Sequence, residues 1–362
     1  MRILLIGEYS NVHWTLAQGL RSLGHEVCVI SNGDFWKNYP RDIDVARTPG
    51  KLGGIRLMLK LWSILPKMRG YDVVQLINPM FFELKAERLF WFYQYLRKHN
   101  KRVFLGAYGL DYYWVHECIE RKPLRYSDFN IGEQLRTNED ALKERADWLG
   151  TAKERLNRLI ANDCDGIVTG LYEYDVCYRP SFPEKTCFIP FPINSFQPIN
   201  PITSAQKLCI FIGISKQRSA YKGTDIMLKA AEAIVSKYPE QVVLKKAEGV
   251  PFAEYQQMMD SSDILLDQLY AYTPAMNALL AMSKGIVVVG GGEPENYEII
   301  HETELRPIVN VEPTYESVYH ELEQLVLHPE RVPELKRQSI EYIKKHHDFV
   351  KVAMQYVDFW NR

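Results

Sequence analysis

The sequence lacks the features that mark membrane-spanning, disulfide-rich and nucleic-acid-binding chains. None of its apolar runs reaches the roughly 18 residues that a membrane-spanning helix needs. Its six cysteines show no CxxC spacing, which is typical of free thiols in a reducing compartment. A formal net charge of −1 argues against a chain that binds nucleic acid through its overall charge. We therefore expect a cytoplasmic protein without a nucleic-acid partner.

Several ligand-binding motifs are also missing. The loop after the first apolar run is not GxGxxG, which argues against NAD or FAD, and no Walker A loop occurs. No zinc-spaced histidines and no nucleophile elbow are present. Asp163 and Asp165 form a DxD pattern, but acidic residues just before a strand commonly cap and turn the chain. We expect neither a metal nor a cofactor. The first apolar run is also too short for the core of a signal peptide.

The pattern of apolar residues predicts an α/β fold. A chain of 362 residues is long enough for two domains, and 46% hydrophobic with 25% charged residues is typical of a globular protein. Continuous apolar runs alternate with stretches of helical periodicity, which predicts a parallel sheet covered on both faces. In the first half we expect a helix over residues 11–23 and strands at residues 2–7, 26–31, 72–77, 102–107 and 165–170.

The pattern breaks at residues 190–205, where four prolines and the absence of periodicity indicate a linker. It then restarts with strands at residues 208–213, 241–246, 263–268 and 285–290, a helix over residues 224–237 and a helical stretch at residues 333–360. We expect two doubly wound domains facing across a cleft. The first comprises residues 1–195, with a final helix at about 346–362 packed back on it, and the second comprises residues 206–345.

Two loops are candidate binding elements because ligands bind beyond the carboxyl ends of strands in open α/β sheets. In the loop after the first strand, Gly7 either makes the turn alone or lets a ligand approach, and Ser10 or Asn11 is expected to cap the next helix. The loop after Gly213 carries the basic residues Lys216, Arg218 and Lys222 before a helix amino terminus. Cations beside a helix dipole suit a diphosphate, although a solvated basic loop is the alternative.

A third element follows the strand at residues 263–268. A polar and aromatic loop leads into a short apolar helix, which Thr273 is expected to cap, and its free N–H groups suit phosphate. A triple glycine at residues 290–292 allows close approach of a ligand, and two glutamates follow it. The ligand-side residues of this element are Thr273, Asn277, Gly291, Gly292, Glu293 and Glu295.

Residues 45–71 form a basic amphipathic segment that contains six Lys or Arg residues and no acidic residue. Apolar residues are interleaved with the basic ones. Such a segment can lie on an anionic membrane surface. Alternatively, its apolar side covers the amino-terminal sheet, and the two interpretations are compatible.

Six stretches of the sequence, in order, resemble the family-4-like glycosyltransferases (glycosyl transferases group 1) of the GT-B fold, over nearly the whole chain. LAQGLRSLGHEVCVIS resembles the family pattern LAxxLxxxGHEVxVI, and YDVVQLINP resembles its DVVHxH strand. AYGLD is similar to HGxD, and FIPFPIN to vIPNGvD. FIGISKQRSAYKGTDIMLKA resembles fvGrlxxxKGxdxLlxA, and LLAMSKGIVVV resembles LEAMAxGxPVV.

The resemblance implies two Rossmann-like domains, an amino-terminal one for the acceptor and a carboxyl-terminal one for a nucleotide-sugar donor. It also implies hexosyl transfer, without a metal and with retention, to a glycan or lipid-linked acceptor in surface polysaccharide assembly. By position, Lys222 and Arg218 would hold the diphosphate, Gly7 would approach it, and Asp111 would contact the acceptor or the transferred sugar. The acceptor side would include Ser10, Asn11, His13 and Tyr108, and the donor side would include Lys216.

The sequence departs from the family pattern at its paired glutamates, which fall on Tyr272 and Leu280. Two other readings therefore stay open. The first is a sugar-nucleotide epimerase of the same architecture, for which His13, His116 and Glu117 are the obvious ionisable residues. The second is a non-catalytic protein that binds a nucleotide-sugar. Turnover separates the binder from the enzymes, and loss of the nucleoside diphosphate from the sugar separates the transferase from the epimerase.

Overall fold

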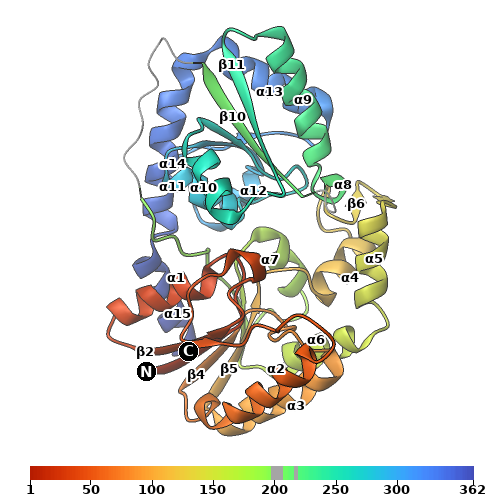
Figure 1. Cartoon of the computed structure of the whole chain (residues 1–362), viewed down its shortest axis with the longest axis vertical. Coiled ribbons are helices and arrows are strands. Elements are labelled where there is room, and N and C mark those ends of the chain that lie inside the picture. The colour runs from red at the N-terminus through yellow and green to blue at the C-terminus, as the bar shows by residue number, and fades with distance from the viewer. Residues whose placement is uncertain (197–206, 216–218) are drawn as a thin grey trace. The chain divides into compact units, whose positions relative to one another are not determined.

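The computed structural model describes residues 1–196, 207–215 and 219–362, which form two compact units (Figure 1). The first unit consists of Met1–Pro123, Glu144–Pro192 and Phe349–Arg362. The second consists of Leu124–Lys143 and Ile193–Asp348. Residues 124–143 therefore belong to the second unit, although they lie in sequence within the stretch assigned to the amino-terminal domain. Residues 197–205, most of the predicted linker, lie outside the described residues.

The first unit is built on a seven-stranded parallel sheet with the strand order β3-β2-β1-β4-β5-β8-β9. This order is the doubly wound Rossmann arrangement with one further strand, and it reverses direction between β1 and β4. The five strands expected in this half of the chain are all present. The strands are β1 (Arg2–Ile6), β2 (Glu26–Ser31), β3 (Ile43–Asp44), β4 (Val73–Leu76), β5 (Arg102–Ala107), β8 (Gly166–Thr169) and β9 (Thr186–Phe188).

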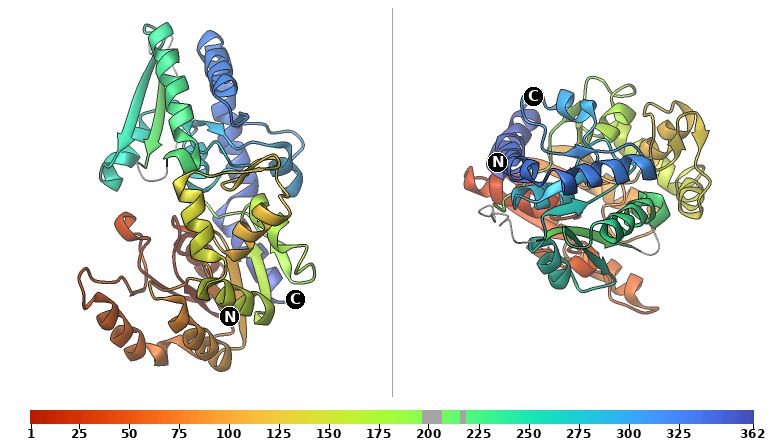
Figure 2. Two further views of the ribbon diagram at one scale, coloured as in Figure 1. Left: turned by 90° about the vertical axis from the view of Figure 1, so that its right-hand side faces the viewer. Right: turned by 90° about the horizontal axis from the view of Figure 1, so that it is seen from above.

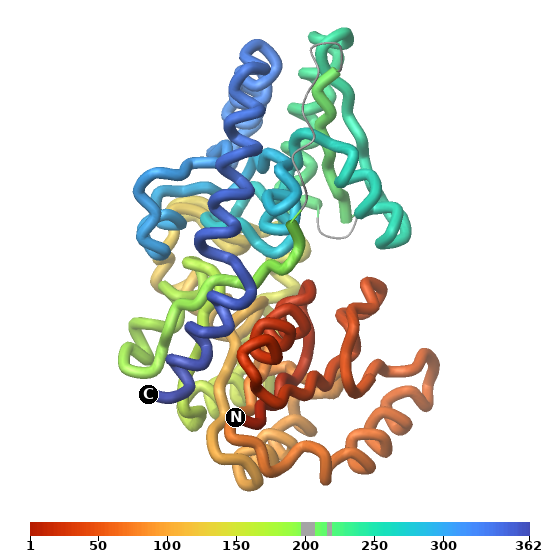
Figure 3. Tube along the Cα trace, turned by 90° about the vertical axis from the view of Figure 1, so that its left-hand side faces the viewer, coloured from red at the N-terminus to blue at the C-terminus, as the bar shows by residue number. Residues whose placement is uncertain are grey.

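Helices cover this sheet, and the last helix of the chain is one of them. Helix α15 packs beside α1, as the dark-blue and red segments of Figure 3 show. The buried Trp360 at its end donates from its indole to Gln75 of β4. The helices of this unit are α1 (Val12–Ser22), α2 (Gly53–Ser63), α3 (Ala86–His99), α4 (Tyr112–Glu120), α6 (Ala152–Asp163), α7 (Tyr172–Tyr178) and α15 (Phe349–Trp360), and α5 (Glu139–Trp148) begins in the second unit and ends in the first.

The second unit contains a five-stranded parallel sheet with the order β11-β10-β12-β13-β14. This is the other common doubly wound order, and it reverses between β10 and β12. The green helix α9 runs along β10 and β11 (Figures 1 and 2). The strands are β10 (Leu208–Ile214), β11 (Val242–Glu248), β12 (Ile264–Leu266), β13 (Val287–Gly290) and β14 (Val309–Asn310). The four strands and the helix over residues 224–237 expected here are present.

The remaining elements of the second unit are helices and one hairpin. The hairpin strands are β6 (Asn130–Ile131) and β7 (Gln134–Leu135). The helices are α8 (Ser219–Lys222), α9 (Thr224–Lys237), α10 (Phe252–Asp260), α11 (Met276–Ser283), α12 (Pro294–Ile299), α13 (Tyr315–Leu327) and α14 (Val332–His346). The stretch expected to be helical at residues 333–360 thus forms two helices, α14 and α15, with a break at His347 and Asp348.

The contact between α1 and α15 depends on a glycine. A Cβ atom on Gly19 would lie 2.3 Å from the carbonyl oxygen of Phe349 and 2.9 Å from the Cβ of Ala353. We predict that Gly19→Ala lowers the free energy of unfolding by about 1–3 kcal/mol, because α15 must shift. This figure is the net change, after the gain of about 1 kcal/mol that alanine brings within a helix. Urea denaturation of the parent and the variant measures the difference.

The matched control is Gly54→Ala in α2, where the nearest atom to an added Cβ is 3.9 Å away. It is expected to be neutral or stabilising. A Gly19→Ala variant as stable as the parent would contradict the close packing of α1 on α15.

Candidate functional site

The switch point of the second sheet brings together two loops that the sequence separates by more than forty residues. Helices α8 and α9 follow β10, and Lys222 ends α8. Gly223 then adopts a left-handed conformation, with φ of 73°, at the N-cap position of α9. The loop after β12 lies against this turn, because the amide of Leu269 donates to the carbonyl of Lys222 at 3.0 Å. Ligands bind at such a switch point in doubly wound sheets.

Asp267, the first residue after β12, is an acidic neighbour of Lys222 that the sequence analysis did not single out. Burial raises the pKa of its carboxyl, whereas the charge of Lys222 and a hydrogen bond from Asn277 lower it. The amide nitrogen of Asn277 donates to Asp267 at 3.2 Å, and the Tyr255 hydroxyl donates to the Asn277 oxygen at 3.0 Å. Asn277, expected to face a ligand, thus also orients Asp267. The signal in the sequence was a carboxylate directly after a buried strand.

The expected cap by Thr273 is wrong. Helix α11 begins three residues later, at Met276, with Ala275 at its N-cap and no side-chain capping bond. Thr273 is buried in the preceding loop. Its polar side chain belongs to the loop rather than to the helix end, because the apolar helix begins only after Pro274 and Ala275.

Gly291 and Gly292 are required by packing within the second unit itself. A Cβ on Gly291 would lie 2.5 Å from the carbonyl oxygen of Ala271, and one on Gly292 would lie 2.7 Å from Ile308. The amide of Gly292 also donates to Asn310 at 3.1 Å. These glycines allow the loop after β13 to pack closely on the loop after β12 and on β14.

Glu293 and Glu295 both bind Arg125, which lies in the segment 124–143. The guanidinium of Arg125 donates to Glu293 at 2.7 Å and to Glu295 at 3.2 Å. The Tyr126 hydroxyl also donates to the buried Glu293. Burial acts to raise the pKa of Glu295, but the hydrogen bond from Arg125 lowers it below its usual value. The two carboxylates are therefore held in an ionic cluster of the second unit.

Tyr272, which stands at the position of the family's first glutamate, joins this cluster. Its hydroxyl accepts from the backbone amide of Arg125 at 2.7 Å, and its ring lies 4.9 Å from that of Tyr126. Leu280, at the second glutamate position, lies in α11 and is half-buried. Lys216 and Arg218 fall outside the part of the chain that the structure describes.

The switch point of the first sheet lies between β1 and β4 and is formed by the Gly7 loop. Gly7 has φ of 85°, and a Cβ there would lie 2.2 Å from Ile77. The expected cap by Ser10 or Asn11 is wrong: Asn11 is the N-cap of α1 but makes no capping bond. Instead Glu8 accepts from the amides of His13 at 3.2 Å and Trp14 at 2.9 Å. Asn11 cannot do so because its φ of 72° departs from the extended N-cap conformation.

Two predicted acceptor-side residues, His13 and Tyr108, are buried close to one another. Their rings lie 6.3 Å apart, edge to face. Burial lowers the pKa of His13 to about 3, so the imidazole is neutral at pH 7. Its Nδ1 lies 2.8 Å from the carbonyl of Gly7, which places the proton on Nδ1. The Tyr108 hydroxyl is hydrogen-bonded to that of Tyr356 in α15.

Asp111 is fully buried at the amino terminus of α4. It accepts from the amide of Trp114 at 2.9 Å and from the hydroxyl of Tyr178 at 2.7 Å. Burial raises the pKa of its carboxyl to about 7. Asp111 thus caps a helix that also carries His116 and Glu117, whose side chains lie 3.2 Å apart.

The DxD pair has structural partners. Asp163 accepts from Tyr93 at 2.7 Å, and Asp165 pairs with Arg97 and accepts from the amide of Val103 at 2.7 Å. Among the described residues, His, Cys, Asp and Glu side chains form no group of three or more suited to a metal ion.

Helix α2, in the predicted amphipathic segment, is apolar on two sides. Leu57 and Leu61 are buried, whereas Ile55, Leu59 and Trp62 are 56–60% exposed. The helix therefore covers the core and also presents an apolar outer surface. Within the described ranges, no helix combines the length and apolar composition needed to cross a bilayer.

The chain has the GT-B fold. It aligns over 100% of its length with 98% of the sucrose-phosphate synthase of Thermosynechococcus elongatus, at 12% identity and a TM-score of 0.62. It aligns over 99% with 99% of the Anabaena protein HepE in complex with UDP and glucose, at 11% identity and a TM-score of 0.59. A UDP-GlcNAc 2-epimerase from Neisseria meningitidis, bound to UDP-GlcNAc, matches over 99% of both chains at 13% identity and a TM-score of 0.54.

No protein-family model and no curated protein sequence matches the chain. The structural likeness therefore defines the class, a GT-B protein of two Rossmann-like domains. The activity has to be argued from the site.

Glu8 gives the first unit a testable pH dependence. Burial raises the pKa of its carboxyl to about 8, against an ordinary value of 4.5. Between these two pH values the folded state binds more protons than the unfolded state, so stability falls as the pH rises and levels off above pH 8. We predict that the unfolding free energy of Glu8→Gln, relative to the parent, improves by about 1 kcal/mol or more from pH 5 to pH 8.

Urea denaturation at several pH values measures this difference. Glu26→Gln, on the exposed end of β2, is the matched control. Parallel pH profiles for the parent and Glu8→Gln would show that Glu8 does not carry the effect.

Proposed function

We propose that this protein is a glycosyltransferase that moves a sugar from a nucleotide-sugar donor to a glycan or lipid-linked acceptor. The observation that carries the proposal is the placement of Lys222 and the half-buried Asp267 after two neighbouring strands, β10 and β12, at the switch point of the second sheet. A lysine beside a helix amino terminus suits the diphosphate of a nucleotide-sugar. The GT-B fold, and a neighbour in complex with UDP and glucose, support this assignment.

In the proposed reaction the bond between the anomeric carbon and the diphosphate oxygen breaks, and a bond to the acceptor oxygen forms. The proton of the acceptor hydroxyl passes to the departing diphosphate. Lys222, with Arg218 and Lys216 of the same loop, stabilises the charge that develops on the leaving group. One well-placed donor of this kind contributes about 3–4 kcal/mol to the transition state. Retention and independence from metal are part of the proposal, by analogy with the family that the sequence resembles.

The neutral and buried groups of the first unit suit an acceptor side rather than a second charged site. His13 is uncharged at pH 7, and Gly7 turns the loop at the carboxyl end of β1. Asp111 already accepts hydrogen bonds from Trp114 and Tyr178. In this proposal it therefore affects the acceptor indirectly, by positioning α4.

The altered glutamate positions support one alternative, a protein that binds a nucleotide-sugar without turning it over. Tyr272 uses its hydroxyl to hold the backbone of Arg125, and the nearby Glu293 and Glu295 bind the guanidinium of the same residue. Release of a nucleoside diphosphate in the presence of acceptor distinguishes the transferase from this binder, and also from an epimerase.

We also propose that α2 binds an anionic bilayer, which suits a lipid-linked acceptor and a cytoplasmic protein at the membrane surface. Ile55, Leu59 and Trp62 supply exposed apolar area, and the exposed Arg56 and Lys60 lie beside them. Basic residues flanking an apolar helix face are the pattern of interfacial helices.

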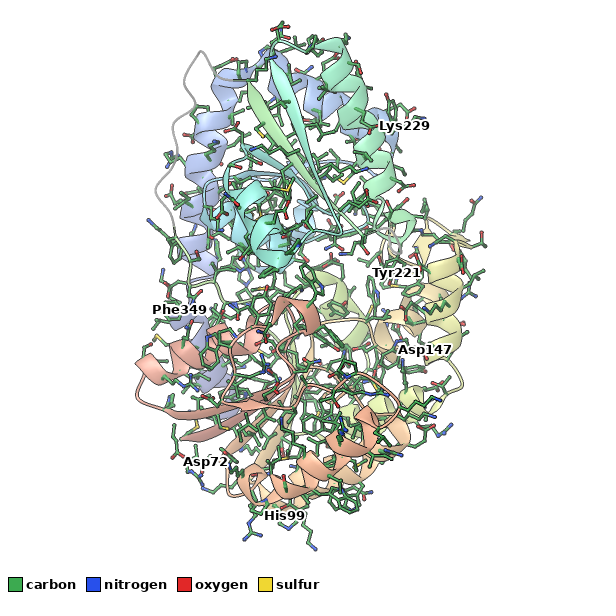
Figure 4. The ribbon with its side chains drawn as sticks, in the orientation of Figure 1. Asp72, His99, Asp147, Tyr221, Lys229 and Phe349 are labelled. Atoms are coloured by element: carbon green, nitrogen blue, oxygen red, sulfur yellow. The ribbon has the colours of Figure 1, made fainter. Side chains whose placement is uncertain are left out.

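Lys222→Ala is predicted to remove most of the donor affinity while leaving the fold intact. A saturating ligand at a hundredfold excess over its dissociation constant stabilises the folded state by about 2.7 kcal/mol. We expect one class among UDP-, GDP-, ADP-, CMP- and dTDP-sugars to raise the melting temperature of the parent and not of Lys222→Ala. Lys229→Ala, on α9 and labelled in Figure 4, is the matched control and keeps the shift. Equal shifts in the parent and Lys222→Ala would remove Lys222 from the site.

For α2, we predict that the parent sediments with vesicles of anionic phosphatidylglycerol and far less with neutral phosphatidylcholine. Arg56→Glu with Lys60→Glu weakens this binding by lost electrostatic attraction, and Leu59→Ser with Trp62→Ser weakens it by lost apolar burial. Lys98→Glu, on the exposed side of α3 in the same unit, is the control for a change of charge elsewhere. Binding that all variants share equally would leave α2 with a structural role only.

A further inference from the structure

The segment Leu124–Lys143 is a folded part of the second unit. Its hairpin, β6 and β7, turns at Gly132, which has φ of 56°. The buried Asn130 holds the hairpin from inside by donating to the carbonyls of Leu124 and Gly132, both at 3.0 Å. The segment therefore has a defined fold with its own internal hydrogen bonds.

This segment packs on the loops at the switch point of the second sheet. Figure 1 shows β6 beside α8, the short helix that ends at Lys222. The ring of the buried Phe129 lies edge to face with that of Tyr221, 6.2 Å away. Tyr221, labelled in Figure 4, is buried directly before Lys222. The segment thus reaches the turn that the proposed function assigns to the diphosphate.

Arg136 makes the polar part of this contact. Its guanidinium donates to the carbonyl of Ala220 at 2.6 Å and to that of Tyr221 at 3.1 Å. A third bond, at 3.1 Å, goes to the carbonyl of Ser127 within the segment. The carbon of the guanidinium lies 3.7 Å from the centre of the Tyr270 ring, in the loop after β12. One side chain therefore joins the segment, the Lys222 turn and the loop that carries Asp267.

We propose that Arg136 is a positioning residue that fixes the backbone turn carrying Lys222 and so sets the affinity of the site for a diphosphate. The proposal rests on the proposed function. Arginine suits this role because its planar group donates several bonds in fixed directions and stacks on an aromatic ring at the same time. The bonds go to the two carbonyls that precede Lys222, at a point where Gly223 already bends the chain into a left-handed conformation. Without Arg136 the turn loses these bonds, and the backbone no longer holds the side chain of Lys222 in one position.

The contacts of Arg136 also explain why lysine cannot replace it. An ammonium group is a compact charge that reaches one or two carbonyls without covering the Tyr270 ring. Arg136→Lys keeps the net charge of the unit and the attraction to an anion. A long-range electrostatic role would therefore be preserved in Arg136→Lys, and a positioning role would not.

The first test is a double-mutant cycle on ligand affinity. Isothermal titration measures the binding of UDP, GDP and ADP, and of the corresponding monophosphates. The proteins compared are the parent, the single variants Arg136→Ala, Arg136→Lys and Lys222→Ala, and the double variant Arg136→Ala with Lys222→Ala. The quantity compared is the affinity for the nucleoside diphosphate divided by that for the monophosphate. For the nucleotide that binds, we expect this ratio to fall about tenfold in Arg136→Ala and in Arg136→Lys. In the Lys222→Ala background, Arg136→Ala has no further effect, because Arg136 acts through Lys222.

Full retention of the diphosphate preference in Arg136→Ala would overturn the proposal. Effects of the two substitutions that multiply would also overturn it, because they would show that Arg136 acts independently of Lys222. Thermal unfolding of each variant in the absence of ligand identifies any variant that fails to fold.

A second measurement needs no ligand and separates this inference from the proposed function. Amide hydrogen exchange is expected to quicken over residues 219–224 and 267–270 in Arg136→Ala. Arg125→Ala is the matched control, because Arg125 lies in the same segment but binds Glu293 and Glu295. In that variant we expect faster exchange near residues 293–297 instead. If no nucleotide binds the parent, the proposed function fails, and the exchange data alone decide whether Arg136 holds the turn. Unchanged exchange over residues 219–224 in Arg136→Ala would refute the positioning role of Arg136.

Discussion

The position of β10 in the middle of the strand order β11-β10-β12 is the constraint on which the candidate site depends. Parallel strands need crossover connections, and the reversal of strand order at β10 sends successive connections to opposite faces of the sheet. The carboxyl ends of β10 and β12 are therefore left side by side, with Lys222 following one and Asp267 the other. The hydrogen bond from the amide of Leu269 to the carbonyl of Lys222 joins the two connections at this point, and it is possible because the two strands are neighbours.

Much of the fold could be predicted from the sequence because it depends on local patterns. Strands buried on both faces produce continuous apolar runs, and the predicted runs correspond to β1, β2, β4, β5 and β8 in the first unit. Helix α9 was predicted at its observed bounds, since Gly223 before it and the apolar spacing within it are both local signals. The helical stretch predicted at residues 333–360 is divided at His347, whose carbonyl accepts from the amide of Ile193, and the final helix predicted at about 346–362 corresponds to α15.

The candidate site could be predicted only in part, because its contacts join distant residues. Lys222 was found from its place before a helix. Asp267 was missed because its significance comes from the pairing of β12 with β10. The cap of α1 was expected from Ser10 or Asn11, whereas the side chain of Glu8 accepts from the amides of His13 and Trp14, and Asn11 is in a left-handed conformation. Nothing in the sequence of residues 124–143 indicates that Arg125 and Arg136 bind partners from about 85 to 170 positions later.

The membership of residues 124–143 in the second unit has a consequence for synthesis on the ribosome. The chain passes from one unit to the other after Pro123, Lys143, Pro192 and Asp348. The first unit stays incomplete until α15 has emerged, because Tyr108 bonds with Tyr356, and Arg102 donates to the terminal carbonyl of Arg362. Residues 124–143 emerge early but must wait for the strands on which they pack. The first unit therefore cannot complete its fold before the second unit has been synthesised, and residues 124–143 cannot pack before residues 193–348 have followed them.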